Sequence, residues 1–170
     1  MRATRFFGWM LGVALLAGCA NYSLGPTGAL PFKSLYVAPA QSKAYVPQAQ
    51  APVTEFVRQS LLQEGTVTLA DQANADATLD IILTDYHRSI AATAQSNTLN
   101  ARSYILTLVA SCTLVNNRTG KVYFKDRLVT ASTETYVSES NDFSEPEYQA
   151  IPLLARELGR KIKDTVVGTW

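Results

Sequence analysis

The sequence predicts an α+β fold in which two helices pack on one face of a mainly antiparallel four-stranded sheet, forming a two-layer sandwich. Two observations predict this class. Two segments carry apolar residues at steps of three and four, whereas four others alternate apolar and polar residues. These segments follow one another as strand, helix, three strands and helix. With 47% hydrophobic and only 17% charged residues, the chain has the composition of a folded domain.

The first part of the domain supplies one strand and one helix. Alternation predicts a strand from Phe32 to Pro39, which the proline ends. After a polar, proline-containing loop, a helix is expected to begin near Pro52 and to end at Gly65. Its apolar stripe consists of Val53, Phe56, Val57, Ser60 and Leu61. The segment Thr66 to Leu69 is compatible with a short edge strand.

Three antiparallel strands are expected next. They span Ala77 to Arg88, Ser103 to Val115, and Lys121 to Ser132. Ile90 to Asn100 is small, polar and without a pattern, and predicts a mobile loop. Asn116 to Gly120 is typical of a hairpin turn, because Asn and Gly accept a positive φ. Asp126 interrupts the apolar side of the last strand and indicates a bulge or a strand end.

A loop from Thr133 to Pro146 and a final helix from about Glu147 to Val167 complete the domain. The two helices are expected to cover one sheet face, made of Leu79, Ile81, Leu83, Leu106, Leu108, Val122 and Phe124. Leu128 is expected to point the same way as Val122 and Phe124. The opposite face would consist of Ile82, Thr84, Tyr86, Ile105, Thr107, Val109, Tyr123, Lys125 and Arg127. No third helix remains to cover this second face. It either faces water, as one side of an antiparallel sheet can, or contacts a partner.

The residue types do not form an evident catalytic or metal site. His87 is the only histidine, and no Cys or His accompanies it at ligand spacing. Asp80 and Asp85 are five residues apart on one strand and are expected on opposite faces. No glycine-rich phosphate loop is present. The sequence therefore predicts no enzyme, no cofactor and no metal, and a lipid-anchored enzyme that uses His87 is the catalytic alternative.

Charge and cysteine content exclude further classes. The chain has 15 basic and 14 acidic residues, a net charge of +1, so a general nucleic-acid binder is not expected. Cys112 lies inside an apolar strand, where packing is favoured over a reactive thiol. The other cysteine, Cys19, follows an apolar N-terminal run and is expected to be modified there, which leaves Cys112 as the only free thiol. No internal disulfide is therefore predicted.

The N-terminus resembles the signal of a bacterial lipoprotein. Two arginines are followed by an apolar run from Phe6 to Leu16, which is shorter than the roughly 20 residues that span a bilayer. Leu16-Ala17-Gly18-Cys19 resembles a lipobox. This resemblance implies a signal peptide over residues 1–18, a lipidated Cys19, a tether over 19–31 and one α+β domain over 32–170. Ala20 after the cysteine favours the outer membrane, because an Asp there retains lipoproteins at the inner one.

Several segments, in this order, resemble the LptE family of lipopolysaccharide-assembly lipoproteins. They are Cys19 to Leu24 (with Asn21 where many members have Gly), Leu30 to Pro39, Ala73 to Leu79, Thr119 to Tyr123, Ala155 to Leu158, and Trp170. None of these segments is catalytic. Together they extend over most of the chain that follows the lipobox.

The resemblance implies a non-enzymatic lipoprotein on the periplasmic side of the outer membrane. LptE proteins act as a plug inside the LptD β-barrel and contact lipopolysaccharide. The candidate lipopolysaccharide contacts are Arg88, Arg102, Arg118, Lys121, Lys125 and Arg127, since phosphates favour Arg and Lys donors. The candidate partner-facing residues of the sheet are Tyr86, Thr107, Val109 and Tyr123. The alternative is an accessory lipoprotein of another periplasmic secretion or transport complex.

Overall fold

The structure is a computed structural model and describes residues 30–94, 97–136 and 144–168. The chain divides into two units, Met1–Ala29 with Trp170 and Leu30–Thr169, and all of the described residues belong to the second. The predicted signal peptide, the lipidation site Cys19 and most of the predicted tether lie outside the described residues.

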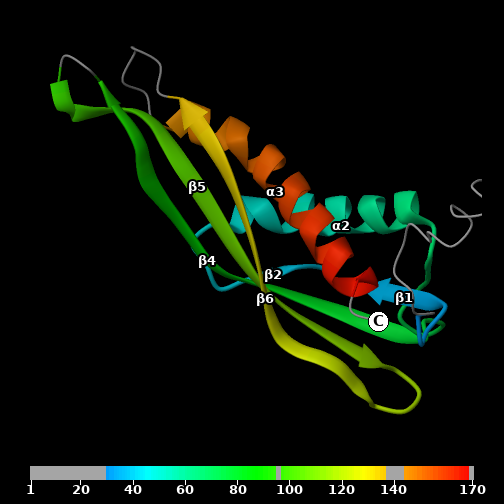
Figure 1. The fold of residues 1–170 in the computed structure, drawn as a ribbon. Helices are drawn as coiled ribbons and strands as arrows, with labels where there is room; N and C mark the ends of the chain where they lie inside the picture. The colour runs from blue at the N-terminus through cyan, green and yellow to red at the C-terminus, as the bar shows by residue number, and fades with distance from the viewer. Residues whose placement is uncertain (1–29, 95–96, 137–143, 169–170) are drawn as a thin grey trace, which may run out of the picture. The chain divides into compact units, whose positions relative to one another are not determined.

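The second unit contains nine described elements in chain order. They are β1 (Ser34–Val37), β2 (Gln41–Ser42), the 3-10 helix η2 (Pro47–Ala49), α2 (Gln50–Glu64), β3 (Thr68–Leu69), β4 (Ala77–Ala94), β5 (Asn97–Asn116), β6 (Val122–Tyr136) and α3 (Ser144–Val167) (Figure 1). The α+β class is confirmed. Gly65 ends α2 as predicted, in a left-handed conformation with φ 71°.

The sheet has six strands in place of the predicted four, and it is mixed. The order is β3-β1-β4-β5-β6, and β2 also pairs with β4. β4, β5 and β6 are antiparallel, but β1 pairs in parallel with both β3 and β4, and β2 pairs in parallel with β4. Of the two additional strands, β3 confirms the short edge strand expected within Thr66 to Leu69. β2 is only two residues long, too short to produce an alternating pattern. A parallel neighbour for β1 is possible because α2 supplies the crossover to β3.

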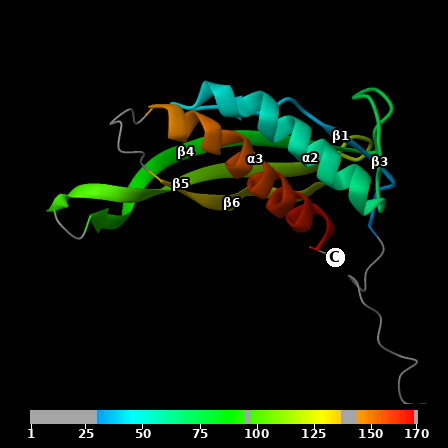
Figure 2. The same ribbon diagram turned by 90° about the horizontal axis from the view of Figure 1, so that it is seen from above.

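Both helices lie on one face of the sheet and side by side (Figure 2). Between the two layers lies a fully buried core that includes Leu61, Leu79, Leu108 and Leu158. The helices approach closely at Gly159, where a Cβ would lie 2.8 Å from the backbone carbon of Phe56. Glycine at this position therefore sets the spacing of the two helices.

The longest strands extend beyond the predicted limits. Ile90 to Asn100 was expected to be a loop, but β4 continues to Ala94 and β5 begins at Asn97. The end of this hairpin runs past both helices (Figures 1 and 2). Because no helix covers it there, its residues need no buried side and show no alternation. Likewise β6 runs to Tyr136, and α3 begins at Ser144, before the expected Glu147.

A bulge in β4 reverses which residues face the helices. Leu83 pairs with Ala110 and Asp85 pairs with Val109, so Thr84 is the extra residue. Tyr86 therefore lies opposite Leu108, on the helix-covered face. The prediction that Tyr86 belongs to the uncovered face was wrong, because it assumed an uninterrupted period of two.

A second bulge lies at Asp126, where an irregularity was predicted. Its φ is 51°, and the register shifts there, because Arg127 pairs with Cys112 and Phe124 with Leu114. Beyond the bulge, Leu128 is 67% exposed and Val129 is buried in its place. A further shift leaves Val122 48% exposed. The expected burial of Leu128 and Val122 was therefore wrong.

Candidate functional site

The side of the sheet away from the helices is a surface that the described helices leave uncovered. Four cross-strand rows on β4, β5 and β6 define it, and we call it the open face. The rows are Ile82–Ser111–Leu128, Asp85–Val109–Thr130, His87–Thr107–Ser132 and Ser89–Ile105–Glu134. Each row joins residues that lie directly opposite one another, so their side chains share this face.

The open face mixes aliphatic and polar groups. Its centre, on β5, alternates half-buried aliphatic and hydroxyl side chains, and Leu128 beside it is 67% exposed. Among the hydroxyls, Thr107 Oγ1 lies 3.1 Å from Ser132 Oγ, and Thr84 Oγ1 donates to the Val109 carbonyl at 3.3 Å. Internal hydrogen bonds thus satisfy part of its polar surface. Such a face can pack against a partner surface that is itself partly polar.

Only two of the four predicted partner-facing residues belong to the open face. Thr107 and Val109 lie at its centre, whereas Tyr86 lies on the opposite side. Tyr123 closes one end of the domain, because its ring lies 5.6 Å from that of Phe32 and its hydroxyl accepts a hydrogen bond from Asn116 Nδ2 at 2.9 Å.

His87 is an exposed member of the open face. Its Nδ1 lies 2.9 Å from Asp85 Oδ2, and the two side chains are 54% and 59% exposed. The β4 bulge places Asp80 and Asp85 on the same face, contrary to the sequence prediction, since they pair with Thr113 and Val109. An imidazole beside a carboxylate and two hydroxyls has the group types of a hydrolytic triad. Here, however, water screens the pair, and catalysis of that kind relies on a water-excluded site.

The six candidate lipopolysaccharide contacts lie at two separate ends of the long strands. Arg88 and Arg102 belong to the part of β4 and β5 nearest their connection. The guanidinium of Arg88 stacks over the Tyr104 ring at 5.0 Å. The side chain of Arg102 lies outside the described part of the structure. These two arginines are therefore not brought together with the other four basic residues.

The other four basic residues surround the β5–β6 turn. Lys121 lies over the Tyr123 ring at 5.8 Å. Arg127 lies over the Phe124 ring at 4.7 Å and, being paired with Cys112, belongs to the helix-side face and not to the predicted open one. Lys125 is exposed, and within the described residues it forms no ion pair.

Arg118 belongs to an anchor at the same end of the sheet. Its Nη2 lies 2.9 Å from Asp76, whose other carboxylate oxygen accepts hydrogen bonds from the backbone N–H groups of Lys33 and Ser34 at 3.0 and 3.1 Å. These backbone N–H groups lower the pKa of Asp76, and Ser34 and Arg118 add to the effect. No sequence pattern indicated this role, because Asp76 bonds to residues more than 40 positions away.

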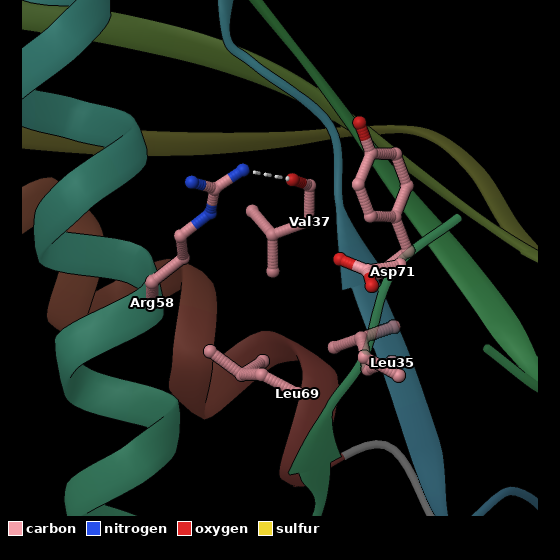
Figure 3. A pocket seen from close by; sticks show the side chains of 7 residues that line it. Leu35, Val37, Arg58, Leu69 and Asp71 are labelled. Atoms are coloured by element: carbon pink, nitrogen blue, oxygen red, sulfur yellow. Dashed lines mark hydrogen bonds between the residues drawn. The ribbon is translucent and has the colours of Figure 1, made fainter. Parts of the chain in front are cut away.

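A pocket of about 340 Å³ lies between α2, β1 and β3 (Figure 3). Its lining consists of Leu35, Tyr36, Val37, Arg58, Leu69, Ala70 and Asp71. The guanidinium of Arg58 donates to the Val37 carbonyl at 2.8 Å, which ties α2 to β1. No sequence motif marked this pocket, because its polar groups come from three separate elements.

Other chemistry is not evident in the part of the chain that the structure describes. Cys112 is fully buried, and burial raises the pKa of its thiol to about 12, so it stays protonated at neutral pH. Within the described ranges, no group of three or more His, Cys, Asp and Glu residues could hold a metal ion. Among the same residues, no helix is long and apolar enough to cross a membrane.

Comparison with known families gives one match. The model of the LptE family, described as lipopolysaccharide-assembly, matches residues 32–166. This range includes every described strand and nearly all of α3. No curated protein matches the chain.

Solved structures share the fold at low sequence identity. A protein from Chlamydia trachomatis aligns with a TM-score of 0.56 and 13% identity, over 81% of this chain and 97% of that one. A protein from Xanthomonas campestris gives a TM-score of 0.54 and 14% identity, over 85% and 91%. Lipoprotein B from Nitrosomonas europaea gives 0.52 and 12%, over 87% and 88%. At these identities the likeness shows the fold alone.

Proposed function

This chain belongs to the LptE lipopolysaccharide-assembly family, a family of non-enzymatic accessory lipoproteins, and we propose that it performs this task as the partner of an LptD-type outer-membrane β-barrel. In this proposal the domain sits as a plug in the barrel lumen. It assists the insertion of lipopolysaccharide and catalyses no reaction.

The observation that supports the barrel partner best is the open face. Three long strands present it, and no described helix covers it. Its rows combine Ile82, Val109 and Leu128 with hydroxyls and carboxylates. The lumen of an outer-membrane barrel is polar, so it suits a mixed surface better than a purely apolar one. We therefore assign the open face to the contact with the barrel wall.

The proposed anchor is a lipid on Cys19. Two or three acyl chains, at about 0.8 kcal/mol per buried CH₂, would hold the protein at a membrane without a spanning helix. About a dozen residues separate Cys19 from β1, so the domain would stay near the periplasmic surface of the outer membrane. That position lies within reach of the base of a barrel.

For the proposed contact with lipopolysaccharide, the residues around the β5–β6 turn are the best candidates. Lys125 is exposed there and has no ion pair with another described residue, so its ammonium is available to a phosphate. Arg118 is less available, because Asp76 engages it. Lys125→Glu should weaken retention on immobilised lipopolysaccharide. Lys43→Glu, at an exposed lysine next to β2, should leave retention unchanged.

The barrel contact is tested by a matched pair of aliphatic-to-arginine changes. Val109→Arg places a charge in the centre of the open face, whereas Leu62→Arg places it on the exposed side of α2, where Leu62 is 62% exposed. Purification of the tagged full chain from outer membranes should recover a β-barrel with the wild type and with Leu62→Arg. The Val109→Arg variant should lose most of it.

Two results would count against the proposal. Recovery of the protein without any barrel would contradict the partnership itself. Recovery of a different assembly, such as a secretion or transport complex, would favour the accessory-subunit alternative. Circular dichroism of each purified variant separates a lost contact from a lost fold.

A further inference from the structure

The edge of β6, which borders the open face, offers a second possible contact through its backbone. β6 is the last strand of the sheet order, and among the strands that the structure describes it pairs only with β5. Residues 127–136 match residues 112–103 of β5 one to one, without a register shift. This regular stretch begins directly after the bulge at Asp126. An edge of this length is a template for another strand.

One hydrogen bond shows which backbone groups point away from β5. Lys161 Nζ, on α3, donates to the Thr130 carbonyl at 2.9 Å, so this carbonyl points away from β5, and a strand that pairs here displaces the ammonium from it. In an antiparallel strand, the N–H and C=O groups of one residue point to the same side, and this side alternates from one residue to the next. The outward-pointing set is therefore Leu128, Thr130, Ser132, Glu134 and Tyr136. No hydrogen bond joins their backbone to another described backbone outside β5.

We propose that the free edge of β6 pairs antiparallel with the same edge of a second copy of this chain, with Ser132 opposite Ser132. This inference goes beyond the function in lipopolysaccharide assembly. It concerns the chain when no barrel is bound.

Self-complementarity of the edge selects this register. With Ser132 on the two-fold axis, Leu128 lies opposite Tyr136 of the second copy, and Thr130 lies opposite Glu134. Leu128 and Tyr136 are 67% and 69% exposed, so the pairing covers two large apolar side chains in each copy. Glu134 is the only charged residue from 128 to 136, and it faces a threonine.

Neighbouring registers are less favourable. A shift of the axis to Ala131 places Leu128 opposite Glu134, and Tyr136 opposite Asp126. A shift to Thr130 places Asp126 opposite Glu134, and like charges directly opposite one another are destabilising. A shift to Thr133 leaves Leu128 without an opposite residue in β6. The Ser132 register alone pairs the two exposed apolar residues.

Cysteine crosslinking tests the register directly. Cys112 is fully buried and protonated at neutral pH, so it competes little with an introduced exposed thiol. Opposite residues in a hydrogen-bonded pair have Cα atoms about 5.5 Å apart, which suits a disulfide. In the full chain purified in detergent without a barrel, Ser132→Cys should form a covalent dimer under mild oxidation.

Two further variants separate this register from random collision. Leu128→Cys and Tyr136→Cys should each crosslink poorly alone but efficiently when the two variants are mixed. Ser132→Pro removes an outward N–H and should yield a monomer by light scattering where the wild type is a dimer, with an unchanged circular dichroism spectrum. Equal crosslinking of single and mixed variants, or a wild type that is monomeric, would overturn the proposal. Neither result affects the barrel co-purification with Val109→Arg, which is measured separately.

Discussion

Single residues in this domain fix the ends of the sheet. Asp76 accepts hydrogen bonds from two backbone N–H groups of the β1 segment and pairs with Arg118 of the β5–β6 turn. Three segments that are distant in sequence thus meet at one carboxylate. Asp76 itself lies within Ala73 to Leu79, one of the segments that resemble the family.

Replacement of Asp76 should change how stability depends on pH. Its pKa is lowered from 3.8 by the backbone N–H groups of Lys33 and Ser34, so the ionised form favours the folded state. This stabilisation is fully present above pH 3.8 and is lost as the pH falls through the lowered pKa. Asp76→Asn should therefore reduce the Tm most at neutral pH, with a difference that shrinks in acid. Thermal unfolding from pH 7 to 2 measures this, with the exposed Asp80→Asn as the control.

A variant at His87 distinguishes the proposed non-enzymatic function from the alternative of an enzyme that uses this histidine. Its side chain is 54% exposed, and its partner within the described residues is Asp85. His87→Ala should leave growth and envelope integrity intact, with a stability change within about 0.5 kcal/mol. Dye-exclusion and antibiotic-sensitivity assays of cells that carry the variant measure this. A loss of viability with a folded variant would revive the enzymatic alternative.

At the scale of elements, the bulges explain where prediction from the sequence stopped. The four predicted strands and both helices follow from hydrophobic periodicity, and the charged Asp126 on the apolar side of its strand indicated the bulge there. The bulge at Thr84 has a comparable signal, because Asp85 lies two residues after Leu83 and interrupts the apolar side of β4, but the strand prediction assumed an uninterrupted period of two. Each bulge reverses the period of two for every residue that follows it. This reversal moved Tyr86, Leu128 and Arg127 to faces other than those expected.

The exchange of buried and exposed positions after Asp126 can be measured with two side-chain truncations to alanine. Leu128→Ala should cost less than about 0.5 kcal/mol of unfolding free energy, because the side chain is 67% exposed. Val129→Ala should cost about 2 kcal/mol, because that side chain is buried. Urea denaturation of the two variants under reducing conditions measures the difference. The opposite ranking would show that the strand continues without a bulge.

The contact between α2 and α3 depends on Gly159. A Cβ there would lie 2.8 Å from the backbone carbon and 2.9 Å from the Cβ of Phe56. Gly159→Ala should therefore destabilise the domain by about 1–3 kcal/mol through overpacking, although alanine favours an isolated helix. Urea midpoints measure this, with Gln63→Ala on the exposed side of α2 as the control. A stabilised variant would mean that the helices can separate at no cost.

For the whole molecule, the α+β class and the two-helix layer could be predicted from the sequence, and so could the uncovered sheet face. The exact membership of that face could not, because the bulges set it. The division of the six basic residues between two ends of the sheet could not be predicted either, since their separation depends on how far β4, β5 and β6 extend. The pocket beside Arg58 depends on the two-residue strand β3, which has no pattern of its own.

The proposed function rests on contact between the open face and an outer-membrane β-barrel. Photocrosslinking in living cells can detect this contact, with a photoreactive amino acid at Val109 and, as the control, at Leu62. We expect a crosslinked product with the mass of this chain plus a β-barrel from Val109, and none from Leu62. A barrel crosslinked from Leu62 and not from Val109, or no barrel from either position, would contradict it.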